Sequence, residues 1–168
     1  MPVPSVQDLF LYELCSMYDA EHRIVQMLPQ LANECNDSQI KDAFQRHEEE
    51  TRHQIQNLES CFQVLGYEPQ RVTCHVVQGL KEDHDSLTKE NPPEDVLTMF
   101  NVGGAAQTEY FEMACYRGLV EKADRMGLGE CSRLLQENLR QEEDMARTCE
   151  QIGRDLGQRI PSTWRKAA

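Results

Sequence analysis

The sequence lacks the features that mark membrane, secreted and zinc-finger proteins. It has no run of 18 apolar residues and no signal-peptide core, so we expect a cytoplasmic protein. Its seven cysteines are odd in number and include no Cys-x-x-Cys pair, which argues against a disulfide framework or a zinc knuckle. We expect inert buried thiols instead, because cysteine at a helix seam behaves as a small apolar residue.

Basic residues are also scarce. The chain has 17 Lys and Arg against 29 Asp and Glu, a formal net charge of −12. Such a charge repels nucleic acids and anionic membrane surfaces, so neither is expected as a partner. With 168 residues, 39% of them hydrophobic, the chain is long enough for one domain with a substantial core. Bound cations would neutralise part of the excess acid.

Apolar residues recur at spacings of three and four along almost the whole chain, which predicts helices rather than strands. A shorter helical segment is predicted over 70–89, and Pro29 should kink or divide the first helix. The four long helices are predicted over 5–35, 38–65, 94–126 and 130–157.

The order of these elements predicts the architecture. The first two long helices are joined by a tight turn, and so are the last two, while the 70–89 segment crosses between the pairs. This arrangement predicts an all-α four-helix bundle over residues 1–157, followed by a polar tail over 158–168.

Acidic residues interrupt the apolar seam of every long helix near its middle. No Lys or Arg occupies the same seams, and burying even one isolated carboxylate costs several kcal/mol. A bundle whose net stability is about 5–15 kcal/mol cannot hold several uncompensated buried charges, so a pair of divalent metal ions is predicted to neutralise them. The acids on the predicted inner faces are Glu21, Glu50, Glu109, Glu112 and Glu142.

Two of these acids have a partner three residues away, which lies on the same helix face. Glu109 pairs with Glu112, and Glu50 pairs with His53, so each pair can present two ligands to one point. His47 or Gln54 could instead take the place of His53, and a metal-free bundle with the acids at its edges also remains open. His22, His75 and His84 lie off the inner seams and are interpreted as solvated or capping residues.

Several short stretches carry a family resemblance over about residues 4–157. The chain resembles the bacterial YciF/YciE-like family, which is placed in the ferritin-like superfamily. The stretches are MYDAE at 17–21, LPQLA at 28–32, HEEET at 47–51, QNLE at 56–59, GL at 79–80 and LLQENL at 134–139. The resemblance implies a ferritin-like bundle with a dimetal carboxylate centre and a homodimer. Leu9, Leu11 and Val25, which stray from the core seam, are candidates for the dimer face.

The acid pattern is also similar to that of rubrerythrin, and this similarity implies a ligand set. Helix 130–157 departs from many dimetal proteins, because Met145 stands where they have a second histidine, and the chain has no rubredoxin-like Cys-x-x-Cys domain. The implied metal ligands are Glu21, Glu50, His53, Glu109, Glu112 and Glu142.

A carboxylate-rich site with one imidazole suits two iron or manganese ions. The preferred function is a catalase or peroxidase acting on peroxide or dioxygen, because a narrow bundle core leaves little room for a large organic substrate. In this hypothesis Glu50 and one of Glu109 and Glu112 bridge the metals, and the other serves as a ligand or a proton shuttle. Glu21, His53 and Glu142 are the terminal ligands. An iron-oxidising protein and a non-catalytic dimeric scaffold are the alternatives, and the physiological electron donor is not specified.

Overall fold

The computed structural model describes residues 2–160, which form five helices and no strand. Most of the predicted polar tail, residues 161–168, lies outside the described residues. The helical bundle expected from the sequence is confirmed, and the crossover segment forms one helix. The helices are α1 (Val6–Asn33), α2 (Ser38–Leu65), α3 (His75–Lys89), α4 (Glu94–Arg125) and α5 (Gly129–Gly157).

Local chemistry accounts for where the helices start and stop. Ser5 caps α1 by accepting from the backbone N–H of Asp8, and Asp37 caps α2 by accepting from that of Gln39. Gly66 ends α2 in the left-handed conformation with φ 75°, which glycine adopts without a steric cost. Of the two outcomes predicted at Pro29, the division is wrong, since α1 continues through it to Asn33, and the kink stays a prediction.

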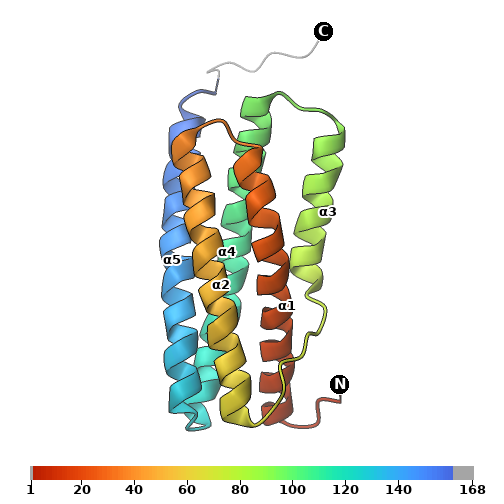
Figure 1. Cartoon of the computed structure of the whole chain (residues 1–168), viewed down its shortest axis with the longest axis vertical. Helices are drawn as coiled ribbons and strands as arrows, with labels where there is room; N and C mark the ends of the chain where they lie inside the picture. Colours follow the sequence, from red (N-terminus) through yellow and green to blue (C-terminus); the bar gives the residue numbers. More distant parts are fainter. Residues whose placement is uncertain (1, 161–168) are drawn as a thin grey trace.

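Four long helices run alternately up and down around a common core (Figure 1). Helices α1 and α2 form one antiparallel pair, and α4 and α5 form the other. The crossover leaves the lower end of α2, and α3 then covers the side of the bundle formed by α1 and α4. Only α3 is short, so it covers one half of the bundle's length.

The crossover is fixed to α1 by polar contacts. Val72 donates its backbone N–H to the carbonyl oxygen of Cys15 at 3.2 Å, and Cys74 donates to the buried carboxylate of Asp19 at 2.8 Å. Arg71 donates to the same carboxylate at 2.8 Å. Asp19 therefore sets the point from which α3 begins.

The core is continuous along the bundle and contains most of the cysteines. All seven are free thiols, six buried and Cys115 half-buried. Val25 is buried in the core and Leu11 is partly buried against it, so of the three residues suggested for a dimer face only Leu9 is exposed. No helix among the described residues is long and apolar enough to cross a membrane.

Candidate metal site

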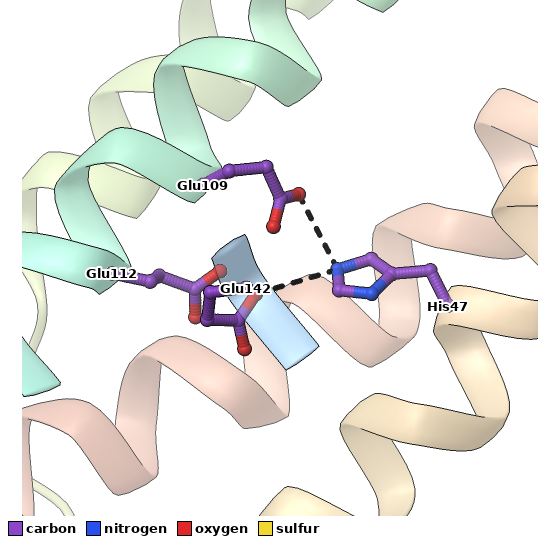
Figure 2. Close-up of side chains that lie close together, drawn as sticks. All are labelled: His47, Glu109, Glu112 and Glu142. Atoms are coloured by element: carbon purple, nitrogen blue, oxygen red, sulfur yellow. Dashed lines mark ion pairs between the residues drawn. The ribbon is translucent and has the colours of Figure 1, made fainter. Parts of the chain in front are cut away.

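Polar side chains replace the apolar core at mid-height of the bundle. His47 comes from α2, Glu109 and Glu112 from successive turns of α4, and Glu142 from α5. Figure 2 shows these four side chains pointing toward one another between the helices. One potential ligand atom from each lies within 4.8 Å of those of the others, and each residue is at most 2% exposed. This buried His/Glu group could hold a metal ion.

The imidazole of His47 lies close to two of the carboxylates but forms no hydrogen bond of good geometry with either. His47 Nε2 lies 3.3 Å from Oε1 of Glu109 and 3.9 Å from Oε2 of Glu142 (Figure 2). Neither ring nitrogen of His47 has a hydrogen-bond partner of acceptable geometry within residues 2–160. A buried imidazole without a partner is costly, so these nitrogens are suited to bind a metal ion.

Glu21, which comes from α1, lies fully buried beside this group and brings the number of buried carboxylates to four. Five carboxylate oxygens of these glutamates have no hydrogen-bond partner in the described part of the chain. There, none of the four is paired with a Lys or Arg, and His47 is the cation available to them. The five oxygens are Oε2 of Glu21, Oε2 of Glu109, both of Glu112, and Oε2 of Glu142.

The pKa values reflect this crowding of negative groups. Burial raises the pKa of Glu21 to about 7. Burial, then the charges of Glu21 and Glu142, raises the pKa of Glu112 well above its usual value, and burial and the charge of Glu109 do the same for Glu142. Burial lowers the pKa of His47, but Glu109 and the other acids outweigh it, so that pKa is raised well above 6.5.

A chain of amides and a phenol orients the carboxylates. Tyr116 donates its hydroxyl to Glu21, and Gln54 donates its side-chain amide to Glu142. Asn138 donates to the Tyr116 oxygen at 3.0 Å and accepts from Asn57 at 2.7 Å. Since every one of these donors is itself buried, the carboxylates of Glu21 and Glu142 are held in fixed positions.

His53 lies outside the group, contrary to the expectation that it faces inward. Its side chain is 47% exposed, and its Nε2 contacts Glu137 at 2.9 Å. The inner face of α2 is instead followed by His47, Thr51, Gln54 and Leu58, all buried. His53 is one residue from Gln54, and one residue turns a helix by about 100°.

Glu50 lies at the edge of the group rather than at its centre. Its side chain is 34% exposed, and Oε2 lies 3.5 Å from Nδ1 of His47. The structure thus brings together Glu21, His47, Glu109, Glu112 and Glu142, leaves Glu50 beside the imidazole, and separates His53 from them. The signal for His47 is the 47, 51, 54, 58 spacing, which the Glu50–His53 pattern obscured.

Of the two interpretations of His84, solvated or capping, the solvated one is wrong, because His84 is buried. It is 4% exposed and its Nε2 lies 2.8 Å from Oε2 of Glu34, at the end of α1. A contact between residues 50 positions apart has no signature in the local sequence.

Comparisons with known proteins agree with the bundle. Residues 5–159 match a family described as a domain of unknown function, DUF892. The chain is 27% identical over 146 residues to protein YciF of Escherichia coli (strain K12), covering 84% of this chain and 86% of that protein.

Solved structures show the same fold. YcfI from Rhodopseudomonas palustris superposes with a TM-score of 0.85 at 29% identity, covering 88% of this chain and 94% of its own. The E. coli stress protein YciF superposes with a TM-score of 0.88 at 23% identity, covering 94% of this chain and 100% of its own.

Proposed function

This chain belongs to the DUF892 family, and we propose that its buried His47–glutamate group holds two divalent metal ions, iron or manganese. In this proposal the protein acts on peroxide or dioxygen in oxidative-stress defence. The observation that carries it is a set of five buried carboxylate oxygens without hydrogen-bond partners among residues 2–160, gathered from three helices around one imidazole. The YciF relative is a stress protein, which agrees with such a role.

Charge balance favours two ions over one. The four buried glutamates carry four negative charges when ionised, and two divalent ions carry four positive charges while leaving His47 neutral. One ion would leave two buried charges or require two of the acids to stay protonated. Carboxylates with an imidazole suit iron and manganese, and a bound metal pair would supply a place to bind and polarise a small oxygen species.

The residues at the edge of the group have supporting roles. Glu50 lies on the Nδ1 side of His47, where it can accept the ring N–H and keep Nε2 turned toward the glutamates. Tyr116 holds one proton against Glu21, and Asn138 fixes the orientation of that hydroxyl. Tyr116 thus keeps a proton next to the oxygen-binding centre, where a reduction of peroxide needs one.

Oxygen release from hydrogen peroxide tests the proposal. Protein reconstituted with Mn²⁺ or Fe²⁺ should release oxygen, or consume peroxide with an added reductant. His47→Ala should abolish this, because it removes the imidazole of the group. His53→Ala is the matched control, since the same substitution falls six residues away on the same helix but outside the group.

The outcomes separate the alternatives. Metal-loaded protein without turnover in either assay contradicts the peroxide activity. If that protein instead oxidises several Fe²⁺ per chain, it handles iron. If metal does not bind at all, a non-catalytic scaffold is favoured. The homodimer stays a proposal, and light scattering measures it directly.

A further inference from the structure

A pocket of about 350 Å³ lies between α1, α3 and α4, in the half of the bundle that α3 covers. This volume is within the range of small-molecule sites, so the bundle has room for a small organic molecule after all. Its walls are mainly apolar and come from all three helices, including Ile24, Leu28, Leu31, Leu80, Met99 and Phe100.

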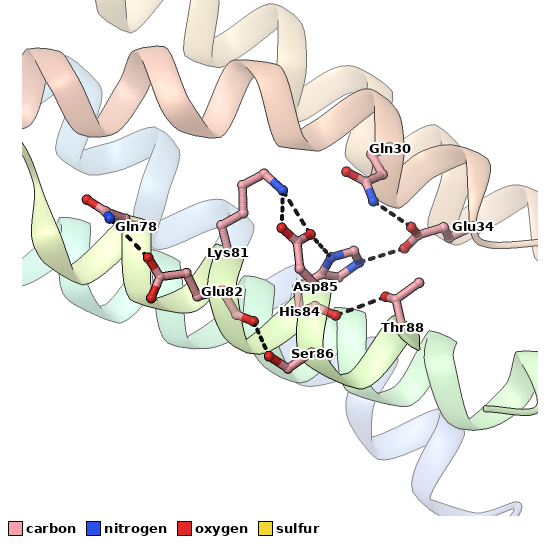
Figure 3. A network of polar contacts seen from close by, with 9 residues as sticks. All are labelled: Gln30, Glu34, Gln78, Lys81, Glu82, His84, Asp85, Ser86 and Thr88. Atoms are coloured by element: carbon pink, nitrogen blue, oxygen red, sulfur yellow. Dashed lines mark hydrogen bonds and ion pairs between the residues drawn. The ribbon is translucent and has the colours of Figure 1, made fainter. Parts of the chain in front are cut away.

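One end of the pocket has a polar group with no partner. Asn101 lines it and is 2% exposed, and its Oδ1 has no hydrogen-bond partner within residues 2–160. The amide cannot simply be reversed, because Nδ2 donates to Oε2 of Glu34 at 2.9 Å and a carboxylate only accepts. Glu34 is also held by Gln30 and His84 (Figure 3), and those hydrogen bonds outweigh burial and lower its pKa, so it stays ionised. Oδ1 of Asn101 is therefore a fixed acceptor that needs a donor.

The other end of the pocket reaches the candidate metal site. Glu109 lines the pocket eight residues beyond Asn101 on α4, a distance of about 12 Å along the helix axis. A molecule lying along α4 would therefore have one end at the Asn101 amide and the other beside the buried glutamates.

Two glycines keep the wall of α4 open. Gly103 and Gly104 line the pocket in the interior of a 32-residue helix, where each costs about 1 kcal/mol relative to alanine. A Cβ at either position would meet no atom of residues 2–160 within 4 Å, so close packing of a neighbouring helix does not explain them. Their effect is to leave space in the pocket.

We propose that this pocket binds a small, mainly apolar molecule bearing one hydroxyl group, a phenol or an alkyl alcohol. The hydroxyl donates to Oδ1 of Asn101, and the apolar body lies along Gly103 and Gly104 toward Glu109. The inference deepens the proposed function by naming the class of organic molecule that can approach the metal site. Binding itself requires no metal.

Calorimetry on the metal-free full chain tests this with two matched probes, 4-ethylphenol and ethylbenzene. The phenol should bind about fivefold more tightly or better, since one net hydrogen bond contributes about 1 kcal/mol. Asn101→Ala should abolish this preference while ethylbenzene still binds. Equal affinities of the two probes for the wild-type chain, or binding of neither up to its solubility, overturn the proposal.

A second variant tests the location. Gly104→Leu fills the pocket and should weaken both probes at least tenfold, by the loss of the apolar contact area. Gly153→Leu is the matched control, because this exposed glycine of α5 also has no atom within 4 Å of a built Cβ. Equal binding by the two variants overturns the location. If Gly104→Leu does not fold, nuclear Overhauser contacts between the ethyl group and the methyl groups of Leu80 and Met99 replace it, and their absence has the same meaning.

Failure here and failure of the proposed function are distinguishable. The binding tests use metal-free protein and organic probes, whereas the peroxide test uses metal-loaded protein and no organic ligand. A chain that releases oxygen but binds neither probe keeps its proposed function and loses this inference.

Discussion

Asp19 and Glu21 are two residues apart on α1, and both are buried, at 4% and 0% exposure. Asp19 accepts hydrogen bonds from Arg23, Arg71 and the backbone N–H of Cys74. These partners outweigh the effect of burial, and the pKa of Asp19 is lowered. Within the described part of the chain Glu21 accepts from one donor, the Tyr116 hydroxyl, and burial raises the pKa of Glu21 to about 7.

Asp19 is a buried acid with a structural role, and Glu21 is a buried acid whose surroundings do not compensate its charge. At Asp19 the chain supplies two cations and an amide and ties the crossover to α1. Around Glu21 the chain places three further acids in place of cations: Glu109, Glu112 and Glu142. Burial of charge without compensation does not stabilise a fold, so the second arrangement fits a site that binds a cation.

The largest expected effect is a loss of stability of the metal-free protein as the pH rises. Glu21 has a pKa of about 7 when folded against 4.5 as a free group, so the folded state binds more protons between these values. The stabilisation is complete below about pH 4.5 and is lost as the pH passes 7. Urea unfolding in chelator at pH 5 and pH 8 should differ by about 3 kcal/mol, and a flat profile contradicts this account.

Isosteric amides at the two positions should have opposite effects. At pH 8 Asp19→Asn should lower the free energy of unfolding of the metal-free protein by about 2 kcal/mol, because charge-assisted hydrogen bonds are lost. Glu21→Gln should raise it by about 2 kcal/mol, because the amide removes a buried charge and can still accept from Tyr116. Chemical denaturation measures both, and at pH 4.5 the Glu21→Gln effect should vanish.

The smallest effect is expected at His53. His53→Ala should change stability by no more than about 0.5 kcal/mol, because an exposed pair with Glu137 contributes little. Metal-dependent stabilisation should be unchanged in this variant and absent in His47→Ala. Thermal unfolding with and without Mn²⁺ compares them, and loss of the metal effect in His53→Ala would restore that residue to the ligand set.

The helices could be predicted from the sequence because apolar spacing and caps act locally. The observed α2 spans Ser38–Leu65, as the Asp37 cap and Gly66 indicate. The inward acids on α1, α4 and α5 follow from the same spacing, since they replace apolar seam residues. Their role as ligands stays a prediction.

The choice between His47 and His53 was missed because two local patterns compete, the 47, 51, 54, 58 spacing for His47 and the Glu50–His53 pair for His53. Both histidines lie close to Glu50 in sequence. A shift of one residue along α2 is enough to turn a side chain from the buried face to the exposed face. The pocket beside Asn101, in contrast, was inaccessible from the sequence, because it depends on where α3 packs against α1 and α4. Such contacts join residues tens of positions apart and are fixed only by the assembled bundle.

Elemental analysis tests the central claim most directly. The protein, produced with added iron or manganese and purified without chelator, should retain about two metal ions per chain, as two-metal carboxylate sites do. A His47→Ala, Glu112→Gln variant should retain almost none, while His53→Ala should match the wild type. A preformed metal site should keep its ions through purification. Fewer than about 0.2 ions per chain in the wild type would therefore contradict the account.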